Sequence, residues 1–88
     1  MVKMKIKISA EARHFIKKSK NPLKDRLIKS ILSIQEDPLH NKYKYIKTKK
    51  PLKRSRCGNY RIIFYIDENN NTLNIVDIKH RNKIYKKV

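Results

Sequence analysis

The chain has 88 residues and a formal net charge of +17, from 24 Lys and Arg against 7 Asp and Glu. This length fits one domain with a small core, expected to span residues 1–88, and the charge indicates a polyanionic partner such as nucleic acid or an acidic protein. The single cysteine, Cys57, excludes an internal disulfide and a multi-cysteine metal site. No apolar run reaches the ~20 residues that span a bilayer, and the N-terminus lacks a signal-peptide core, so we expect a soluble, cytoplasmic protein.

The first eight residues alternate between apolar side chains and lysines. This pattern predicts a half-buried strand whose lysines suit the edge of a sheet. Ser9 follows directly and is placed to cap a helix, in which Ala12, Phe15 and Ile16 form a short apolar stripe. We therefore expect a strand followed by a first helix.

A second helix is predicted after Asn21 and Pro22, with Asn21 as its N-cap and Pro22 as its first residue. Apolar residues recur at helical spacing from Leu23 to Ile34, and Asp37-Pro38 ends the pattern. Two short antiparallel helices packed on one face of a sheet are the simplest consequence.

The stretch from Leu52 to Ile66 predicts a β-hairpin with Gly58 and Asn59 as its two-residue loop. Both flanking segments are rich in strand-forming residues, and the second contains several β-branched and aromatic side chains. Gly58 is the only glycine of the chain, and such a loop contains a position of positive φ that glycine adopts without strain.

The loop fixes the register of the hairpin. Counting outward from it, Arg56 lies opposite Arg61, and Arg54 projects to the same face. Two arginines that face each other repel, which indicates that an anion binds between them; the alternative is a solvated basic hairpin.

The segment before and within the hairpin is strongly basic. From Asn41 to Ile66 there are nine Lys and Arg and no acidic residue. Its lysines either contact phosphate groups or belong to a solvated loop. The RNA-binding candidates are Lys47, Lys49, Lys50 and Lys53.

After a polar turn, Leu73 to Lys79 predicts an interior strand, with Val76 and Ile78 on one face and Leu73 and Ile75 on the other, because apolar side chains on both faces are typical of such a strand. The tail that follows contains Arg81 and Tyr85, which are neighbours if the tail is helical.

The side chains available limit the chemistry. Paired carboxylates and Gly-rich phosphate loops are absent from the sequence, so we expect neither a metal ion nor a cofactor. Cys57 is either an activated thiol or a small hydrophobic residue. An arginine cluster with tyrosine and histidine nearby suits metal-free RNA cleavage, in which a base deprotonates a ribose 2′-hydroxyl, the oxygen attacks the adjacent phosphate and cations stabilise the transition state.

Two motifs carry a family resemblance. The run R-x-G-x-Y-R from Arg56 to Arg61 and the run H-R-x-x-x-Y from His80 to Tyr85 follow a strand, an S-x-E-A turn at Ser9 and two helices. Together they resemble the RelE/ParE superfamily of bacterial and archaeal toxins. The resemblance implies an α+β fold, an antiparallel sheet with two N-terminal helices on one face and a short C-terminal helix, in the order β-α-α-β-β-β-α.

The resemblance also implies roles for single residues. RelE-type members enter the ribosomal A site and cut mRNA, so Arg61 and Arg81 become ligands of the phosphate and the transition state. Arg54 and Arg56 become additional cations, although RelE has lysines on this strand. Tyr85 is either the general base or a packing residue.

His80 leaves two alternatives, because strand parity turns its ring either to the site, for acid–base work, or to the core.

The leading hypothesis is the toxin of a toxin–antitoxin pair, a ribosome-dependent, metal-independent mRNA endoribonuclease that inhibits translation. The alternatives are a ParE-like toxin that inhibits DNA gyrase without nuclease chemistry and an inactive basic RNA-binding module. The expected partner is an acidic, RelB-like antitoxin in a hetero-oligomer, with no membrane association.

Overall fold

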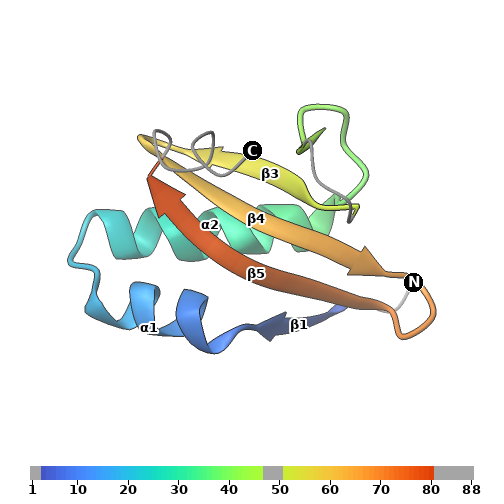
Figure 1. The fold of residues 1–88 in the computed structure, drawn as a ribbon, viewed down its shortest axis with the longest axis horizontal. Coiled ribbons are helices and arrows are strands. Elements are labelled where there is room, and N and C mark those ends of the chain that lie inside the picture. The colour runs from blue at the N-terminus through green and yellow to red at the C-terminus, as the bar shows by residue number, and fades with distance from the viewer. Residues whose placement is uncertain (1–2, 47–50, 81–88) are drawn as a thin grey trace.

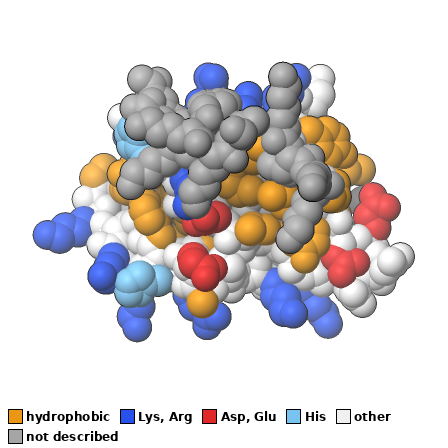
Figure 2. Space-filling model, viewed as in Figure 1, with side chains coloured by type: hydrophobic (Ala, Val, Ile, Leu, Met, Phe, Trp, Pro, Cys, Tyr) orange, Lys and Arg blue, Asp and Glu red, His pale blue; other side chains and the backbone are white. Residues whose placement is uncertain are grey.

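A computed structural model describes residues 3–46 and 51–80. The described part of the chain begins with a short strand, continues with two helices and ends with the remaining strands. The elements are β1 (Lys5–Ile8), α1 (Ala10–Lys18), α2 (Leu23–Glu36), β2 (Lys44–Tyr45), β3 (Lys53–Cys57), β4 (Tyr60–Asp67) and β5 (Thr72–His80). Both helices lie behind the sheet in Figure 1 and cover one of its faces. The opposite face, which no described helix covers, is called the open face and is the one turned to the viewer in Figure 2.

The sheet is mixed. Its strand order is β1-β5-β4-β3-β2, with β1 parallel to β5 and the other neighbours antiparallel. The predicted α+β class and the two N-terminal helices are confirmed, whereas the prediction of a purely antiparallel sheet is wrong. An alternating pattern predicts a strand but not the direction of its neighbour, and β2, with two residues, is too short to give a pattern. The predicted C-terminal helix falls on residues 81–88, outside the described residues.

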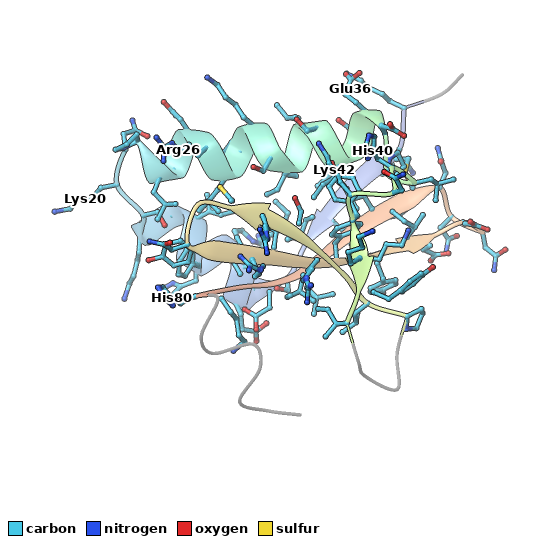
Figure 3. The ribbon with its side chains drawn as sticks, turned by 90° about the horizontal axis from the view of Figure 1, so that it is seen from above. Lys20, Arg26, Glu36, His40, Lys42 and His80 are labelled. Atoms are coloured by element: carbon cyan, nitrogen blue, oxygen red, sulfur yellow. The ribbon has the colours of Figure 1, made fainter. Side chains whose placement is uncertain are left out.

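The β3–β4 hairpin has the register that the sequence predicts. Arg56 pairs with Arg61 and Cys57 with Tyr60, next to the loop. Gly58 has φ of +61°, the left-handed conformation that its loop position requires. Figure 3 shows His80 at the hairpin-turn end of the sheet, as expected from its pairing with Tyr60.

A β-bulge interrupts the pairing of β4 with β5. Ile63 pairs with Asp77 and Phe64 with Ile75, which leaves Val76 as an extra residue. Because of this insertion, Ile75 and the following Ile78 are both buried in the core, at 1% and 3% exposure. The prediction that they lie on opposite faces is therefore wrong, since it assumed an unbroken alternation.

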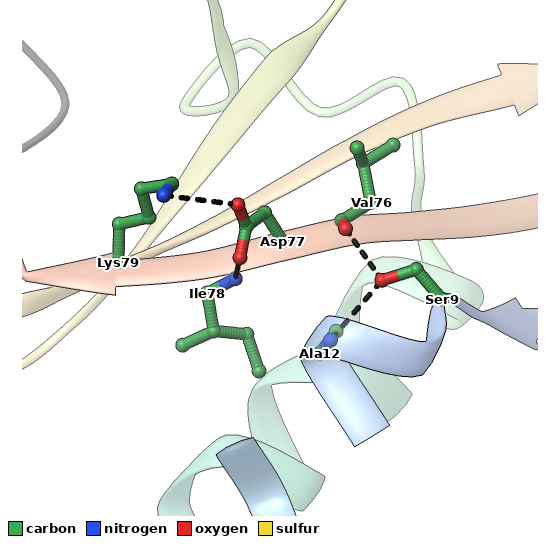
Figure 4. A network of polar contacts seen from close by, with 6 residues as sticks. All are labelled: Ser9, Ala12, Val76, Asp77, Ile78 and Lys79. Atoms are coloured by element: carbon green, nitrogen blue, oxygen red, sulfur yellow. Dashed lines mark hydrogen bonds and ion pairs between the residues drawn. The ribbon is translucent and has the colours of Figure 1, made fainter. Parts of the chain in front are cut away.

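Ser9 ties the start of α1 to this bulge. Its hydroxyl accepts a hydrogen bond from the backbone N–H of Ala12 and donates one to the carbonyl of Val76 (Figure 4). The predicted helix cap at Ser9 is confirmed, and the same side chain satisfies a carbonyl of β5 across the domain.

The second helix begins later than predicted. Pro22, with φ of −85° and ψ of −4°, takes the N-cap position, and no side chain caps the helix. The prediction of Asn21 as the cap is wrong, because Asn21 and Pro22 form a turn that places the first helical residue at Leu23.

The core lies between the helices and the covered face of the sheet. Its largest fully buried side chains are Phe64, Leu27, Ile34, Ile62, Leu73 and Ile75. Tyr43 closes the core at the β3 edge, with its ring 5.4 Å from that of Phe64 in an edge-to-face contact.

Candidate functional site

Three cationic residues stand side by side across the three longest strands. Arg56 on β3 is the register partner of Arg61 on β4, and Arg61 is the partner of Lys79 on β5. Register partners share a face, and strand alternation puts all three opposite the helix-packed residues, on the open face. This set, Arg56, Arg61 and Lys79, is called the cationic row.

Arg61, the middle member of the row, is buried. Only 5% of its surface is exposed, and its Nε atom has no hydrogen-bond partner. Its guanidinium also forms no ion pair among the described residues. A buried polar group without a partner is costly, and a neighbouring arginine adds repulsion, so an anion at this position would relieve both.

Lys79 carries the one acidic neighbour of the row among the residues that the structure describes. Its ammonium lies 3.3 Å from Oδ2 of Asp77, whose other oxygen accepts a hydrogen bond from the N–H of Ile78 at 2.8 Å (Figure 4). Both carboxylate oxygens are therefore engaged. The face keeps more positive than negative charge around Arg61.

Sequence reasoning missed Lys79 and Asp77. The one signal that could have found them is the pairing of β4 with β5, counted outward from the polar turn at residues 68–71. This count gives the wrong partners for Asp77 and Lys79, because the bulge at Val76 shifts the register by one residue before Asp77.

The other predicted cations divide between the two faces. Arg54 is the register partner of Ile63 and lies on the open face, half-buried. Lys53, one residue earlier, alternates to the other side, where its ammonium lies 4.9 Å from the ring centroid of Tyr45. The remaining predicted site residues, Lys47, Lys49, Lys50, Arg81 and Tyr85, lie outside the described residues.

His80 lies on the helix-packed face. It pairs with Tyr60, and the two rings are 5.5 Å apart in an edge-to-face contact. Tyr60 in turn contacts Phe15 of α1 at 5.4 Å. Strand alternation thus places the sheet between the imidazole and the guanidinium of Arg61.

Cys57 is also on the covered face and is 6% exposed. Its burial in the core cluster fits the alternative of a small hydrophobic residue. Within residues 3–46 and 51–80, no group of three or more His, Cys, Asp or Glu is arranged to hold a metal ion. Among the same residues, no helix has the length and apolarity needed to cross a bilayer.

An apolar groove of about 440 Å³ opens between α1, α2 and β1. Its lining includes Ile28 and Leu32 of α2, which are 42% and 46% exposed. Three cations also line it, namely Arg13, Lys17 and Lys24. The groove therefore combines exposed apolar side chains with positive charge.

Comparison with known proteins gives one family and a consistent fold. Residues 6–85 match the family model described as ParE toxin of type II toxin–antitoxin system, parDE. No curated protein matches the chain. The RelBE2 toxin–antitoxin complex from Mycobacterium tuberculosis contains a chain similar at a TM-score of 0.76 and 21% identity, covering 91% of this chain and 100% of that one.

Two further structures are similar at the level of fold. The RelE–RelB complex from Pyrococcus horikoshii matches at a TM-score of 0.75 and 20% identity, over 93% of this chain and 99% of that one. The YoeB dimer from Staphylococcus aureus matches at 0.74 and 17%, over 90% of this chain and 98% of that one. The relatives share the arrangement of helices and sheet on which the cationic row is built.

Proposed function

Because this chain belongs to the RelE/ParE superfamily of toxins from type II toxin–antitoxin systems, we propose that it acts on translating ribosomes as an endoribonuclease that cuts mRNA. The observation that supports this activity is the buried guanidinium of Arg61, which lacks a partner at Nε and faces Arg56. Such a group is suited to a phosphate. A substrate on the ribosome also places the protein in the cytoplasm.

The reaction needs charge stabilisation first. When a ribose 2′-oxygen attacks the adjacent phosphorus, the O2′–P bond forms, the P–O5′ bond breaks, and negative charge accumulates on the phosphoryl oxygens. Arg61 and Arg56 provide fixed positive charge for those oxygens, an effect that can supply several kcal/mol in a site shielded from water. We assign Arg81 as a further ligand of the phosphate and the transition state, and Arg54 as an additional cation of the same site.

Proton transfer needs a different residue, because an arginine holds its proton too strongly to act as a base. Tyr85 is the proposed general base for the 2′-hydroxyl. His80 is the weaker assignment, since its ring packs against Tyr60 on the helix-packed face. Cleavage leaves a 2′,3′-cyclic phosphate and a 5′-hydroxyl, and the proton taken from O2′ balances the one delivered to O5′.

The test uses expression in cells. Arg61→Ala and Arg81→Ala are each expected to abolish growth arrest, whereas Lys18→Ala, an exposed lysine of α1 outside the row, is expected to keep it. Circular dichroism of the purified variants checks that they fold. Primer extension after brief induction should show codon-phased cuts in translated mRNA, and full toxicity of both arginine variants would show the site to be misassigned.

A ParE-like activity is the second candidate, because the matching family model is that of ParE toxins. A toxin that inhibits DNA gyrase would share the fold but would not require the cationic row. Loss of plasmid supercoiling without mRNA cuts would favour this candidate. No growth arrest at all would favour an inactive RNA-binding module.

We further propose an acidic, RelB-like antitoxin as the partner in a hetero-oligomer. Chains of the same fold were crystallised as toxin–antitoxin complexes. The apolar groove, with three cations among its lining residues, suits the apolar side of an amphipathic helix whose other side is acidic. Ile28→Asp is expected to raise the Kd for the antitoxin roughly 10-fold or more, as for a central interface residue, while Asn41→Asp makes the same charge change outside the groove. Equal Kd values for the two variants would exclude the groove as the contact.

A further inference from the structure

A small polar pocket lies at the β3 edge of the sheet, between this strand and α2. Its volume is about 220 Å³. Three serines and three cations line it together with the buried Tyr43: Ser30, Ser33, Ser55, Lys29, Lys42 and Arg56. No acidic residue is among the lining residues that the structure describes. Figure 3 shows Lys42 next to the C-terminal half of α2, where it reaches the pocket from the segment that follows the helix.

The polar groups of the pocket are not used internally. Among the described residues, the three serine hydroxyls form no hydrogen bond and the three cations form no ion pair. Lys42 contacts only the ring of Tyr43 among the charged and aromatic groups described, with its Nζ 5.3 Å from the centroid. Ser55 is 7% exposed as a whole residue, and its hydroxyl has no hydrogen-bond partner within the described part of the chain. The hydroxyl itself is not fully buried, so it can donate a hydrogen bond to a ligand in the pocket.

The backbone of β3 adds a donor at the same edge. β2 pairs only with Lys53 and Arg54, so the described ladder stops before Arg56. The N–H of Ile46 bonds to the carbonyl of Leu52, which shows that even-numbered residues of this stretch direct their backbone groups toward the β2 side. The same alternation directs the N–H of Arg56 to the edge beside the pocket.

We propose that this pocket binds a phosphodiester group of the RNA, next to the cationic row but on the other side of β3. The inference rests on the proposed nuclease function for the identity of the polymer. Hydroxyl and backbone donors combined with lysine and arginine are the groups that bind phosphate oxygens. A volume below the ~300 Å³ of typical small-molecule pockets suits a group of this size rather than a whole nucleotide cofactor.

Arg56 belongs to both sites. Its backbone lies at the edge beside the pocket, and its register partner is Arg61 of the row. A strand of RNA that crosses the β3 edge therefore places one phosphate in the pocket and a later one on the row. The pocket contributes affinity without reading sequence, since all its donors face the sugar–phosphate backbone.

Binding of a single-stranded 2′-O-methyl RNA tests the site, because this probe lacks the attacking hydroxyl and stays intact. Lys29→Gln is expected to weaken binding several-fold and to reduce the slope of log K against log salt by about one. Ser55→Ala should weaken binding with the slope unchanged. Lys18→Gln is the matched control and should match the wild type, because it removes an exposed lysine that lines no part of the pocket.

The proposal is overturned if Lys29→Gln and Ser55→Ala both bind within twofold of Lys18→Gln, or if an aspartate-rich peptide competes as well as RNA of equal charge. A wild-type protein that binds no RNA overturns it as well. Failure of the proposed function gives a different result. Codon-phased mRNA cuts combined with RNA binding that does not depend on the pocket would refute only the proposal for the pocket. RNA binding that depends on the pocket, without any mRNA cuts, would refute only the proposed nuclease activity.

Discussion

Replacement of Arg61 by methionine is expected to stabilise the fold while it removes activity. The side chain is 5% exposed, carries a buried Nε without a partner and faces another arginine. Methionine has a similar unbranched length and fills the same space without a charge or a donor. The apolar contacts of the arginine stem are therefore kept, and its polar cost is lost.

The magnitude follows from the two costs. An unsatisfied buried polar group costs roughly 1–3 kcal/mol, and a like-charge pair directly opposite in a ladder adds a few tenths to about 1 kcal/mol. The lower part of both ranges applies, because Arg56 is exposed and its charge is screened by solvent. We expect Arg61→Met to raise the free energy of unfolding by about 1–2 kcal/mol, which for a domain of this size raises the Tm by roughly 4–16 °C.

Urea denaturation at low and high salt measures the effect. Arg56→Met is the matched control and should gain less, since it relieves the repulsion but buries no new apolar group. An added RNA oligonucleotide should stabilise the wild type by about 2.7 kcal/mol at a hundred times its Kd and stabilise Arg61→Met much less. An Arg61→Met protein that unfolds at lower urea than the wild type would refute the reasoning, because it would show that the guanidinium is satisfied in the free protein.

Three further predictions concern the fold. Ser9→Ala should lower the free energy of unfolding by about 1–2 kcal/mol in urea titrations, because it removes the helix cap and leaves the bulge carbonyl of Val76 unpaired; a change below a few tenths would contradict this. Gly58→Ala should cost about 1–2 kcal/mol from the left-handed backbone alone, since no described atom outside its chain neighbours lies within 4 Å of where the added methyl group would stand, and loss of folding would instead indicate a clash. Burial, together with the charge of Asp37, raises the pKa of Tyr43. Tyr43 therefore ionises at a lower pH in the unfolded chain than in the folded protein. The stability that the neutral phenol contributes is present below about pH 10 and is lost as pH rises further. Urea midpoints at rising alkaline pH should therefore fall less steeply for Tyr43→Phe than for the wild type, and equal slopes would contradict this.

The parts of the fold that depend on neighbouring residues could be predicted from the sequence. The two-residue loop at Gly58 fixes the pairing of Arg56 with Arg61 by counting alone, and the Ser9 cap depends on the first turn of one helix. Contacts between distant segments could not be predicted in the same way. The parallel pairing of β1 with β5 and the bulge at Val76 depend on how the helices return the chain to the sheet.

The same distinction applies to the candidate site. The shared face of Arg54, Arg56 and Arg61 follows from the hairpin register, so the sequence predicts it. That Arg61 is buried and Arg56 exposed depends on their neighbours in space, which no local pattern contains. The polar pocket is less predictable still, because α2, the following turn and β3 each contribute to it.

The cationic row and the polar pocket meet at one residue, and this bears on how the surface is used. The cationic row and the pocket both include Arg56, and each contains a polar group without a partner among the described residues, the buried Nε of Arg61 in the row and the Ser55 hydroxyl in the pocket. The buried Nε of Arg61 lowers the stability of the free protein, and an apolar residue in its place would not. One anionic polymer that crosses the β3 edge satisfies both at once, whereas two unrelated ligands would have to share the same arginine. A single bound RNA strand is therefore the simplest ligand that accounts for both clusters.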